Sequence, residues 1–171
     1  MIAPAPTIFD SLMIIDSTYF EKDPIYISGI ANRKDDKPAT LAQTLIDSAN
    51  SYIAIYEPIF LRNLLGEALA ATVEQNPEVV ALLRNETTKT SPIANYVYFY
   101  WLRTHTTVGT PAGEKVQRGE YSDEASPRIR AVEVWNDMVR QCCALRPKLV
   151  ELGAKPNYCS AIFEPANLFG L

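Results

Sequence analysis

Apolar residues recur at three- and four-residue intervals over most of the chain between residues 39 and 152, which is the period of an amphipathic α-helix. The pattern predicts helices over 39–56 and 58–75, with a short helix over 78–84 after them. Pro58 separates the first two, because a proline inside a helix removes a backbone hydrogen bond, and we expect a kink or a new start there. Gly66 within the second predicted helix indicates that another backbone packs closely against it.

The next helix begins with a clear start signal, since Ser91 is a good N-cap and Pro92 suits the first helical position. No charged residue occurs from Ile93 to Leu102. One side of this helix carries Ile93, Tyr96, Val97, Tyr100 and Trp101, and the other carries Ala94, Tyr98, Phe99 and Leu102. A helix that is apolar all round is buried on both sides, so in a domain this small we expect one side to meet a second subunit.

Ser126 and Pro127 repeat the start signal before a last long helix that runs to Leu152. We expect a kink at Pro147 and a C-cap at Gly153. The apolar positions of this helix are Ile129, Val132, Trp135, Met138, Val139, Cys142, Leu145, Leu149 and Leu152.

The remaining segments complete the predicted fold. Residues 106–125 are a long polar connection that is expected to project as a loop or as a hairpin around Pro111 to Gly113. Residues 1–38 are interpreted as an N-terminal arm, in which Tyr26 to Ile30 form a short strand or remain part of the arm. Residues 154–171 are interpreted as an extended C-terminal arm with apolar anchors. The predicted fold is mainly α: a small helical bundle over 39–153, with a long loop or hairpin between its last two helices and extended arms at both ends.

Composition narrows the classes of function. The net charge is −4 and no run of basic residues occurs, so the chain lacks the electrostatic footprint of a tight nucleic-acid binder. The sequence predicts neither a signal peptide in its first ten residues nor a membrane span. Three cysteines, two of them adjacent, argue against a disulfide framework and favour a reduced setting.

Candidate chemistry is sparse. His105 is the only histidine, and no CxxC or HxxxH spacing accompanies it, so no metal site is predicted. Cys142 falls in the apolar stripe of the last helix, which favours a buried core position over a nucleophile, and an enzyme that uses Cys142 or Cys159 is the weakest hypothesis. No serine lies in a G-x-S-x-G elbow and no phosphate-binding loop is present. We therefore predict no catalytic residue, no metal ligand and no cofactor.

The aromatic run from Tyr96 to Trp101 is the most distinctive feature. Stacking on nucleic-acid bases needs interleaved basic residues, and only Arg103 is near, so packing in the core and at an interface is favoured. A small helical module that binds an apolar ligand, or another protein-interaction module, stays open as the alternative. The residues predicted to form an interface are Tyr96, Phe99, Tyr100, Trp101, Thr107, Val108, Trp135, Phe163, Leu168, Phe169 and Leu171.

The order of several short motifs resembles the head–tail connector (adaptor) proteins of tailed bacteriophages, in the branch found in phages and prophages of Bacteroidetes-type hosts. The resemblance spans roughly residues 40–171. It rests on Tyr56-Glu57 with Phe60-Leu61 and Leu64-Leu65-Gly66, on Ile93-Ala94 and Tyr98 to Arg103 followed by Thr107-Val108-Gly109, on Arg130-Ala131 with Trp135 to Met138, and on the ending Asn167 to Leu171.

This resemblance implies a structural subunit of the virion neck, assembled in the host cytoplasm. Such subunits form a ring, commonly of twelve copies, between the portal protein and a downstream neck or tail protein. The ring extends the channel through which DNA passes without sequence-specific binding. The family has no catalytic residues, so the resemblance implies no enzyme activity, and closed rings use heterologous contacts between unlike patches.

Overall fold

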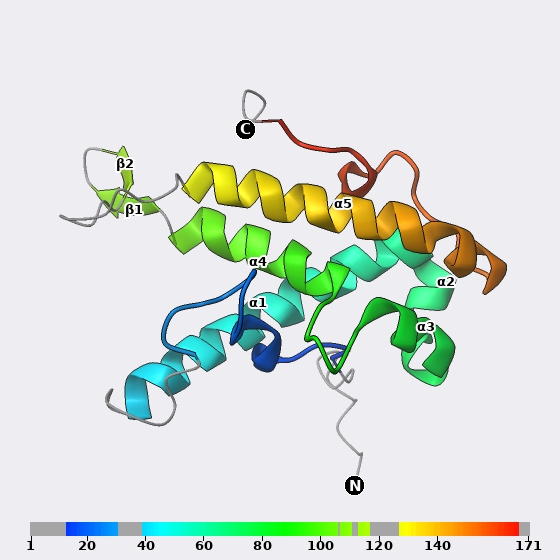
Figure 1. Ribbon diagram of the computed structural model, residues 1–171, viewed down its shortest axis with the longest axis horizontal. Coiled ribbons are helices and arrows are strands. Elements are labelled where there is room, and N and C mark those ends of the chain that lie inside the picture. The colour runs from blue at the N-terminus through cyan, green and yellow to red at the C-terminus, as the bar shows by residue number, and fades with distance from the viewer. Residues whose placement is uncertain (1–12, 31–38, 106, 111–112, 117–126, 168–171) are drawn as a thin grey trace, which may run out of the picture.

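Three long helices form the body of the fold, and α4 (Pro92–His105) lies between α1 (Ala39–Leu65) and α5 (Pro127–Glu151) (Figure 1). The computed structural model describes residues 13–30, 39–105, 107–110, 113–116 and 127–167. Its described part is mainly α-helical, as the apolar periodicity predicts. α4 and α5 run antiparallel, because the chain leaves α4 and enters α5 at the same end of the molecule.

α1 passes through Pro58 as one helix of 27 residues, so no new helix starts at this position. Pro58 is exposed, and the backbone bond that it cannot make to the carbonyl of Ala54 is therefore lost near the solvent side. Ile53 and Phe60 are fully buried on either side of it. Packing of this buried face outweighs the local penalty of the proline.

Gly66 ends α1, so the helix predicted over 58–75 is divided. Gly66 has a φ of +82°, and a Cβ atom added to it would lie 2.7 Å from the carbonyl oxygen of Lys155. The predicted close approach of another backbone is confirmed, and it comes from the C-terminal part of the chain. After Gly66 follow the short helix α2 (Glu67–Ala70), the 3₁₀ turn η2 (Val73–Gln75) and α3 (Pro77–Leu83).

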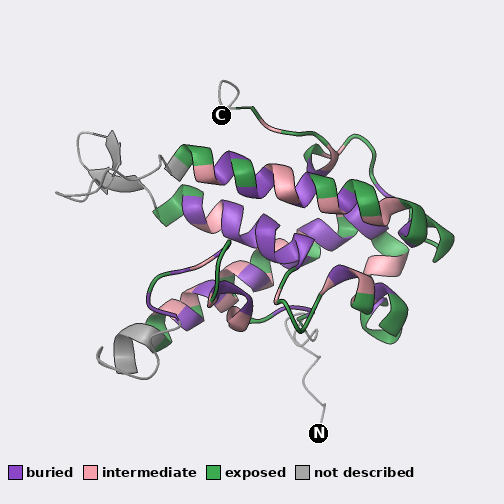
Figure 2. Cartoon of the chain, in the orientation of Figure 1, coloured by how far each residue is buried: buried purple, intermediate pink, exposed green. Residues whose placement is uncertain are grey.

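The start of α4 forms as the sequence predicts. The Ser91 hydroxyl accepts a hydrogen bond from the backbone N–H of Ile93 at 3.1 Å and donates one to the carbonyl of Leu83 at 2.7 Å. Every residue from Pro92 to Phe99 is buried, which makes α4 the most enclosed element of the fold (Figure 2).

The connection between α4 and α5 contains the predicted hairpin. Strands β1 (Thr107–Thr110) and β2 (Gly113–Val116) pair antiparallel, with Thr107 opposite Val116 and Thr110 opposite Gly113. The two strands lie beyond the adjacent ends of α4 and α5 (Figure 1).

α5 continues through Pro147 to Glu151, and Gly153 then terminates it. The N–H of Gly153 bonds to the carbonyl of Val150 at 3.0 Å, and the N–H of Ala154 bonds to the carbonyl of Leu149 at 2.8 Å. These two bonds and the φ of +94° at Gly153 define a Schellman motif, which confirms the predicted C-cap.

Residues 13–30, here called the N-terminal strap, differ from the predicted arm because they belong to the core. The strap contains the 3₁₀ turn η1 (Ser17–Phe20), which Asp16 caps, and forms no strand over residues 26–30. Its buried side chains are Ile14, Ile15, Tyr19, Phe20, Ile25, Ile27 and Ile30. The apolar side chains of the strap are therefore buried against their own chain. The other residues of the predicted arm, 1–12 and 31–38, lie outside the described part of the structure.

Residues 154–167, here called the C-terminal segment, return along α1 and α5 and include the 3₁₀ turn η3 (Ala161–Phe163). The N–H groups of Lys155 and Asn157 bond to the carbonyls of Leu65 and Asn63, each at 2.8 Å. The side chain of Ile162 is buried and that of Phe163 is half-buried. The C-terminal segment therefore docks on its own chain.

Candidate functional site

A cluster of aromatic rings joins the three long helices, and Tyr96 of α4 lies at its centre. The ring centroid of Tyr96 is 5.1 Å from that of Phe60 on α1 and 6.1 Å from that of Trp135 on α5. Tyr56 stacks on Tyr100 with ring centroids 4.2 Å apart and planes inclined by 10°. Burial raises the pKa of Tyr96 above its usual value, and a hydrogen bond with the Tyr100 side chain adds to the rise. The aromatic rings of α1, α4 and α5 contact one another and together fill the space between these helices.

Most of the predicted interface residues that the structure describes are therefore core residues. Tyr96, Phe99 and Trp135 are each less than a tenth exposed, and all three contact rings of their own chain. Tyr100 and Phe163 are half-buried against the same core. The N-terminal strap covers α4 around Tyr98, so these residues of α4 are buried within the chain, and the predicted contact with a second subunit stays a prediction.

The other predicted interface positions fall outside this description. Thr107 and Val108 belong to β1, whose backbone pairing is described but whose side chains are not. Leu168, Phe169 and Leu171 lie beyond residue 167, outside the described residues. The interface role predicted for these five positions stays a prediction.

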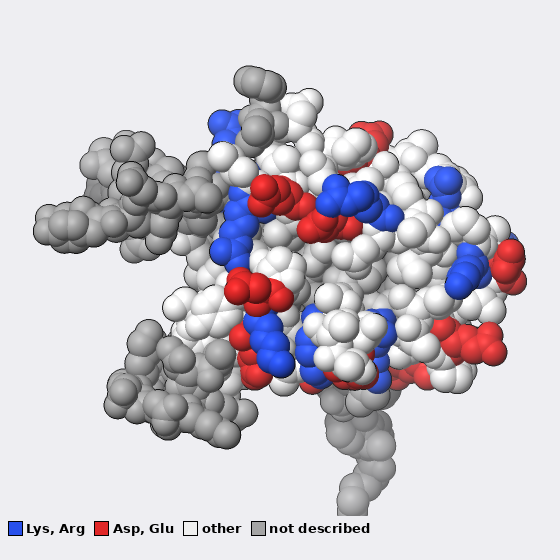
Figure 3. All heavy atoms as spheres, in the orientation of Figure 1, with Lys and Arg blue, Asp and Glu red and all other residues white. Residues whose placement is uncertain are grey.

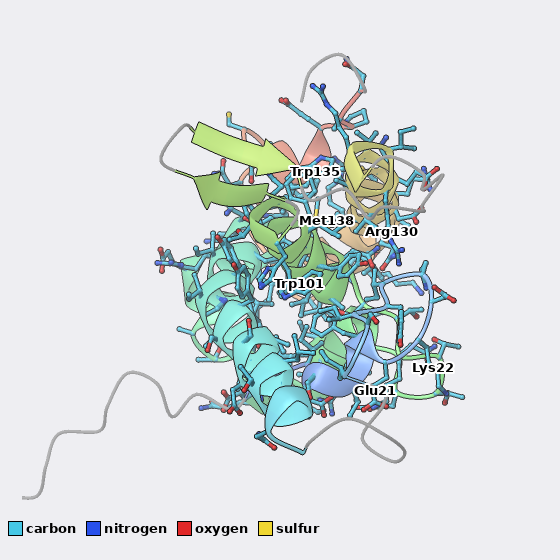
Figure 4. All side chains as sticks on the ribbon, turned by 90° about the vertical axis from the view of Figure 1, so that its left-hand side faces the viewer. Glu21, Lys22, Trp101, Arg130, Trp135 and Met138 are labelled. Atoms are coloured by element: carbon cyan, nitrogen blue, oxygen red, sulfur yellow. The ribbon has the colours of Figure 1, made fainter. Side chains whose placement is uncertain are left out.

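Trp101 is half-buried and lies on the side of α4 that faces α1 (Figure 4). Its indole stacks on the imidazole of His105 with centroids 4.3 Å apart, and it also stacks on Tyr98 at 5.9 Å. The indole Nε1 is buried and has no hydrogen-bond partner among the described residues. His105 ends α4, and its Nδ1 lies 2.9 Å from the carbonyl oxygen of Trp101.

The least expected group is Glu57 of α1, a carboxylate that is only 4% exposed. Its Oε1 accepts the backbone N–H of Ile14 at 2.7 Å, and its Oε2 accepts that of Ile15 at 3.3 Å. The Arg84 guanidinium, which follows α3, donates to the carbonyl of Ile14 at 2.7 Å. We call Glu57 and Arg84 the latch, because together they bind the N–H groups of Ile14 and Ile15 and the carbonyl of Ile14.

Burial raises the pKa of Glu57 to about 7, although the two backbone N–H groups that it accepts act in the opposite direction. Nearby Glu74 raises this pKa further, and Arg84 lowers it. A buried carboxylate with two hydrogen bonds is costly to ionise and costly to remove. Glu57 is therefore a buried carboxyl group with a pKa near neutrality, and both of its hydrogen bonds go to the strap backbone.

Two further side chains fix the strap at its other end. The Tyr98 hydroxyl donates to the carbonyl of Tyr26 at 3.0 Å, and Arg130 of α5 donates to the carbonyl of Pro24 at 2.9 Å. Arg130 also lies over the Tyr98 ring at 5.5 Å, on the side of α5 next to the strap (Figure 4). All of these contacts reach the strap backbone from side chains of the helical body.

The sequence contains a signal for the burial of Glu57. Ile53, Glu57, Phe60 and Leu64 are spaced by four, three and four residues, so Glu57 occupies the apolar stripe of α1. A carboxylate at such a position indicates a buried polar partner. Nothing in the sequence identifies backbone N–H groups more than forty residues away as that partner.

The thiols and other ionisable groups do not converge on a reaction centre within the described residues. Cys142 is fully buried, and burial raises the pKa of its thiol to about 12, whereas Cys143 and Cys159 are exposed. In the part of the chain that the structure describes, no three His, Cys, Asp or Glu side chains are grouped as metal ligands would be. The buried position of Cys142 agrees with its place in the apolar stripe.

On the face shown in Figure 3, lysine and arginine side chains are interspersed with aspartate and glutamate, and neither sign dominates a large area. Long-range attraction of a polyanion needs such an area. Among the described helices, none combines the length and hydropathy that a membrane crossing requires.

Comparison with known proteins gives no relative for this arrangement. No family model, no curated protein and no solved structure matches the chain.

Proposed function

We propose that this chain is a structural subunit of a tailed-phage neck, which assembles into a ring between the portal protein and the tail and extends the DNA channel. The sequence motifs listed for the connector family support this proposal. The helical bundle agrees with it in general form. The apolar surface of α4 no longer supports it, because the chain itself covers that surface.

The observation that carries the proposal is the β1–β2 hairpin. It continues from the ends of two antiparallel helices and lies beyond them, which leaves it free of the three-helix core (Figure 1). An extension of this kind is suited to a neighbouring subunit or to the channel of a ring. Contact between a hairpin on one copy and a different surface on the next is heterologous, and heterologous contacts close into rings.

The full-length protein, alone and mixed with the portal protein, tests the proposal. Light scattering is expected to show a closed oligomer in at least the mixed sample, and electron microscopy to show rings with a central opening. A Val108→Asp variant should weaken the rings without lowering the melting temperature, because β1 is not part of the core. Glu133→Gln, on the exposed face of α5, is the matched control. A protein that remains monomeric with the portal and is absent from virions contradicts the proposal.

One observation favours a second function, that of a small helical module that binds an apolar ligand. The indole Nε1 of Trp101 and the hydroxyl of Tyr19 are buried without a partner among the described residues, and buried polar atoms normally have one. A ligand that accepts a hydrogen bond would satisfy either atom. Mass spectrometry of co-purified material, with thermal shifts against a ligand panel, tests this function. Protein that is free of ligand and shows no shift contradicts it.

A further inference from the structure

The N-terminal strap covers a face of the helical body that is otherwise strongly apolar. Phe20 is 1% exposed, and its ring stacks on that of Tyr98 with centroids 6.4 Å apart. Gly29 approaches α1 so closely that an added Cβ would lie 2.7 Å from Cδ1 of Leu45. Without the strap, α4 would lose its cover around Tyr98, whose ring stacks on Phe20 and whose hydroxyl bonds to the carbonyl of Tyr26. The strap therefore completes the burial of α4.

The hydrogen bonds of the strap allow it to leave the helical body as one unit. Its backbone–backbone hydrogen bonds connect strap residues to one another, for example Ile27 N–H to the carbonyl of Phe20 at 2.9 Å. Among the described residues, no backbone–backbone hydrogen bond links the strap to the helices. The bonds to the body come instead from four side chains: Glu57, Arg84, Tyr98 and Arg130. Its removal consequently breaks no helix and no sheet.

We propose that the N-terminal strap is exchanged between copies of this chain, and that the latch of Glu57 and Arg84 controls its release. In the exchanged form, the strap of one copy lies on α1 and α4 of the next. This inference rests on the proposed function, because it names the contact that would join neighbouring subunits.

A second copy is the occupant that best fits the uncovered face. The face is shaped by the side chains of the strap, and the latch binds the backbone N–H groups and carbonyl of residues 14 and 15. The same segment from another copy reproduces each of these contacts. Exchange of an identical element is a low-cost route to association, because no new complementary surface has to form.

The latch makes the release of the strap depend on pH. The charged groups that act on the Glu57 carboxylate are Arg84 after α3 and Glu74 in η2, and they have opposite effects on its pKa. With the strap in place this pKa is about 7, and once the strap leaves, water restores an ordinary value near 4.5. The released state thus loses the proton more readily. Release is favoured as pH rises from 5 to 8.

The test uses the full-length protein and a fluorescent synthetic peptide of residues 13–30. Exchange predicts that the peptide binds in trans and displaces the strap. Displacement passes through the open state, which ionised Glu57 favours, so binding should be faster at pH 8 than at pH 5 by roughly tenfold or more, whereas the fraction bound at equilibrium should change little. The same peptide with Phe20→Asp is expected not to bind, because Phe20 fills the contact with Tyr98. In a Glu57→Gln protein, the rate of binding should be independent of pH, whereas Glu133→Gln should behave as the unmodified protein does.

Each result decides the matter. No binding of the peptide at either pH overturns the exchange, and equal binding of the Phe20→Asp peptide does so as well. Equal rates of peptide binding to the unmodified protein at pH 5 and pH 8 overturn the role of Glu57. If Glu57→Gln does not fold, the pH comparison on the unmodified protein remains decisive. Rings without peptide exchange would refute this inference alone, and exchange without rings would refute the proposed function alone.

Discussion

The two terminal segments of the described fold both pack on the helical body, but different chemistry fixes each of them. The C-terminal segment pairs its backbone with that of α1, through Lys155 to Leu65 and Asn157 to Asn63. It is also fixed by neutral side chains of α5, since the Trp135 indole donates to the carbonyl of Glu164 at 2.9 Å. The bonds from the body to the N-terminal strap come from side chains, and three of the four belong to acidic or basic residues: Glu57, Arg84 and Arg130.

This difference separates an integral segment from a detachable one. Neutral hydrogen bonds between backbones do not respond to pH in the physiological range, so the C-terminal segment should remain fixed wherever the fold is stable. The strap depends on a carboxylate whose pKa lies near neutrality. The comparison predicts that the two segments respond differently to substitution, to pH and to hydrogen exchange.

The largest effect is expected for Phe20→Ala in the strap. Removing a fully buried phenylalanine leaves a cavity beside Tyr98 and lowers the free energy of unfolding by about 3–5 kcal/mol. Urea denaturation at pH 7 measures the change. Lys22→Ala, at an exposed strap position, is the control and should shift stability by less than about 0.5 kcal/mol. Equal effects from both variants would show that the strap is not part of the core.

Gly66→Ala should destabilise the attachment of the C-terminal segment. An alanine here adopts a φ of +82° and places its Cβ against the Lys155 carbonyl, so strain and overlap together cost about 3 kcal/mol. Gly153→Ala is the matched control, because its φ is +94° but no atom lies within 4 Å of an added Cβ, and about 1 kcal/mol is expected. Thermal denaturation compares the two, and hydrogen exchange at Lys155 and Asn157 reports the local effect. A cost at Gly66 no greater than at Gly153 would argue against the close backbone contact.

Glu57→Gln should alter the pH dependence of stability. The pKa of Glu57 is raised on folding, so its contribution is fully present below about pH 4.5 and is lost as pH rises through about 7. The unmodified protein should therefore lose on the order of 2 kcal/mol between pH 5 and pH 8, and the variant should be nearly flat over that range. Urea titrations at several pH values measure both slopes. A slope that persists in the variant would assign the titration to another group.

The comparison also explains which features were predictable from the sequence. Ser91-Pro92 and Gly153 are local signals, because each residue type suits the backbone at its own helix end. The hairpin is local as well, since its strands β1 and β2 lie close together in sequence. The close contact at Gly66 was predictable as a contact, but Lys155 as its partner was not. The apolar residues of the strap follow no regular period, so the sequence alone favours an arm there. Its place is decided by Glu57 and Arg84, which are distant in sequence.

The same reasoning explains why α4 was assigned to a subunit interface. Its uncharged sequence correctly indicates burial on every side. The regular helices leave part of α4 uncovered, and the irregular N-terminal strap fills that position. An apolar helix therefore indicates how much surface must be covered, and it does not indicate whether the cover comes from the same chain.

The smallest effect is expected for Asn136→Asp, which tests the neutral attachment of the C-terminal segment with a change of one side-chain group. Asn136 accepts the N–H of Ala166 at 2.8 Å and donates to its carbonyl at 3.0 Å, so it pairs with that residue as a second strand would. A carboxylate keeps the acceptor and loses the donor, which leaves two oxygens facing each other and costs about 1 kcal/mol. The cost should vanish below about pH 4, where the protonated acid regains a donor, so the variant should approach the unmodified protein in acid. Urea denaturation at pH 3.5 and pH 7 measures this recovery, with Asn136→Ala as the control that cannot recover. The strap is also held more firmly in acid, but through Glu57. Recovery of the stability of Asn136→Asp relative to the unmodified protein would arise from its own carboxyl group, so the two terminal segments would titrate independently.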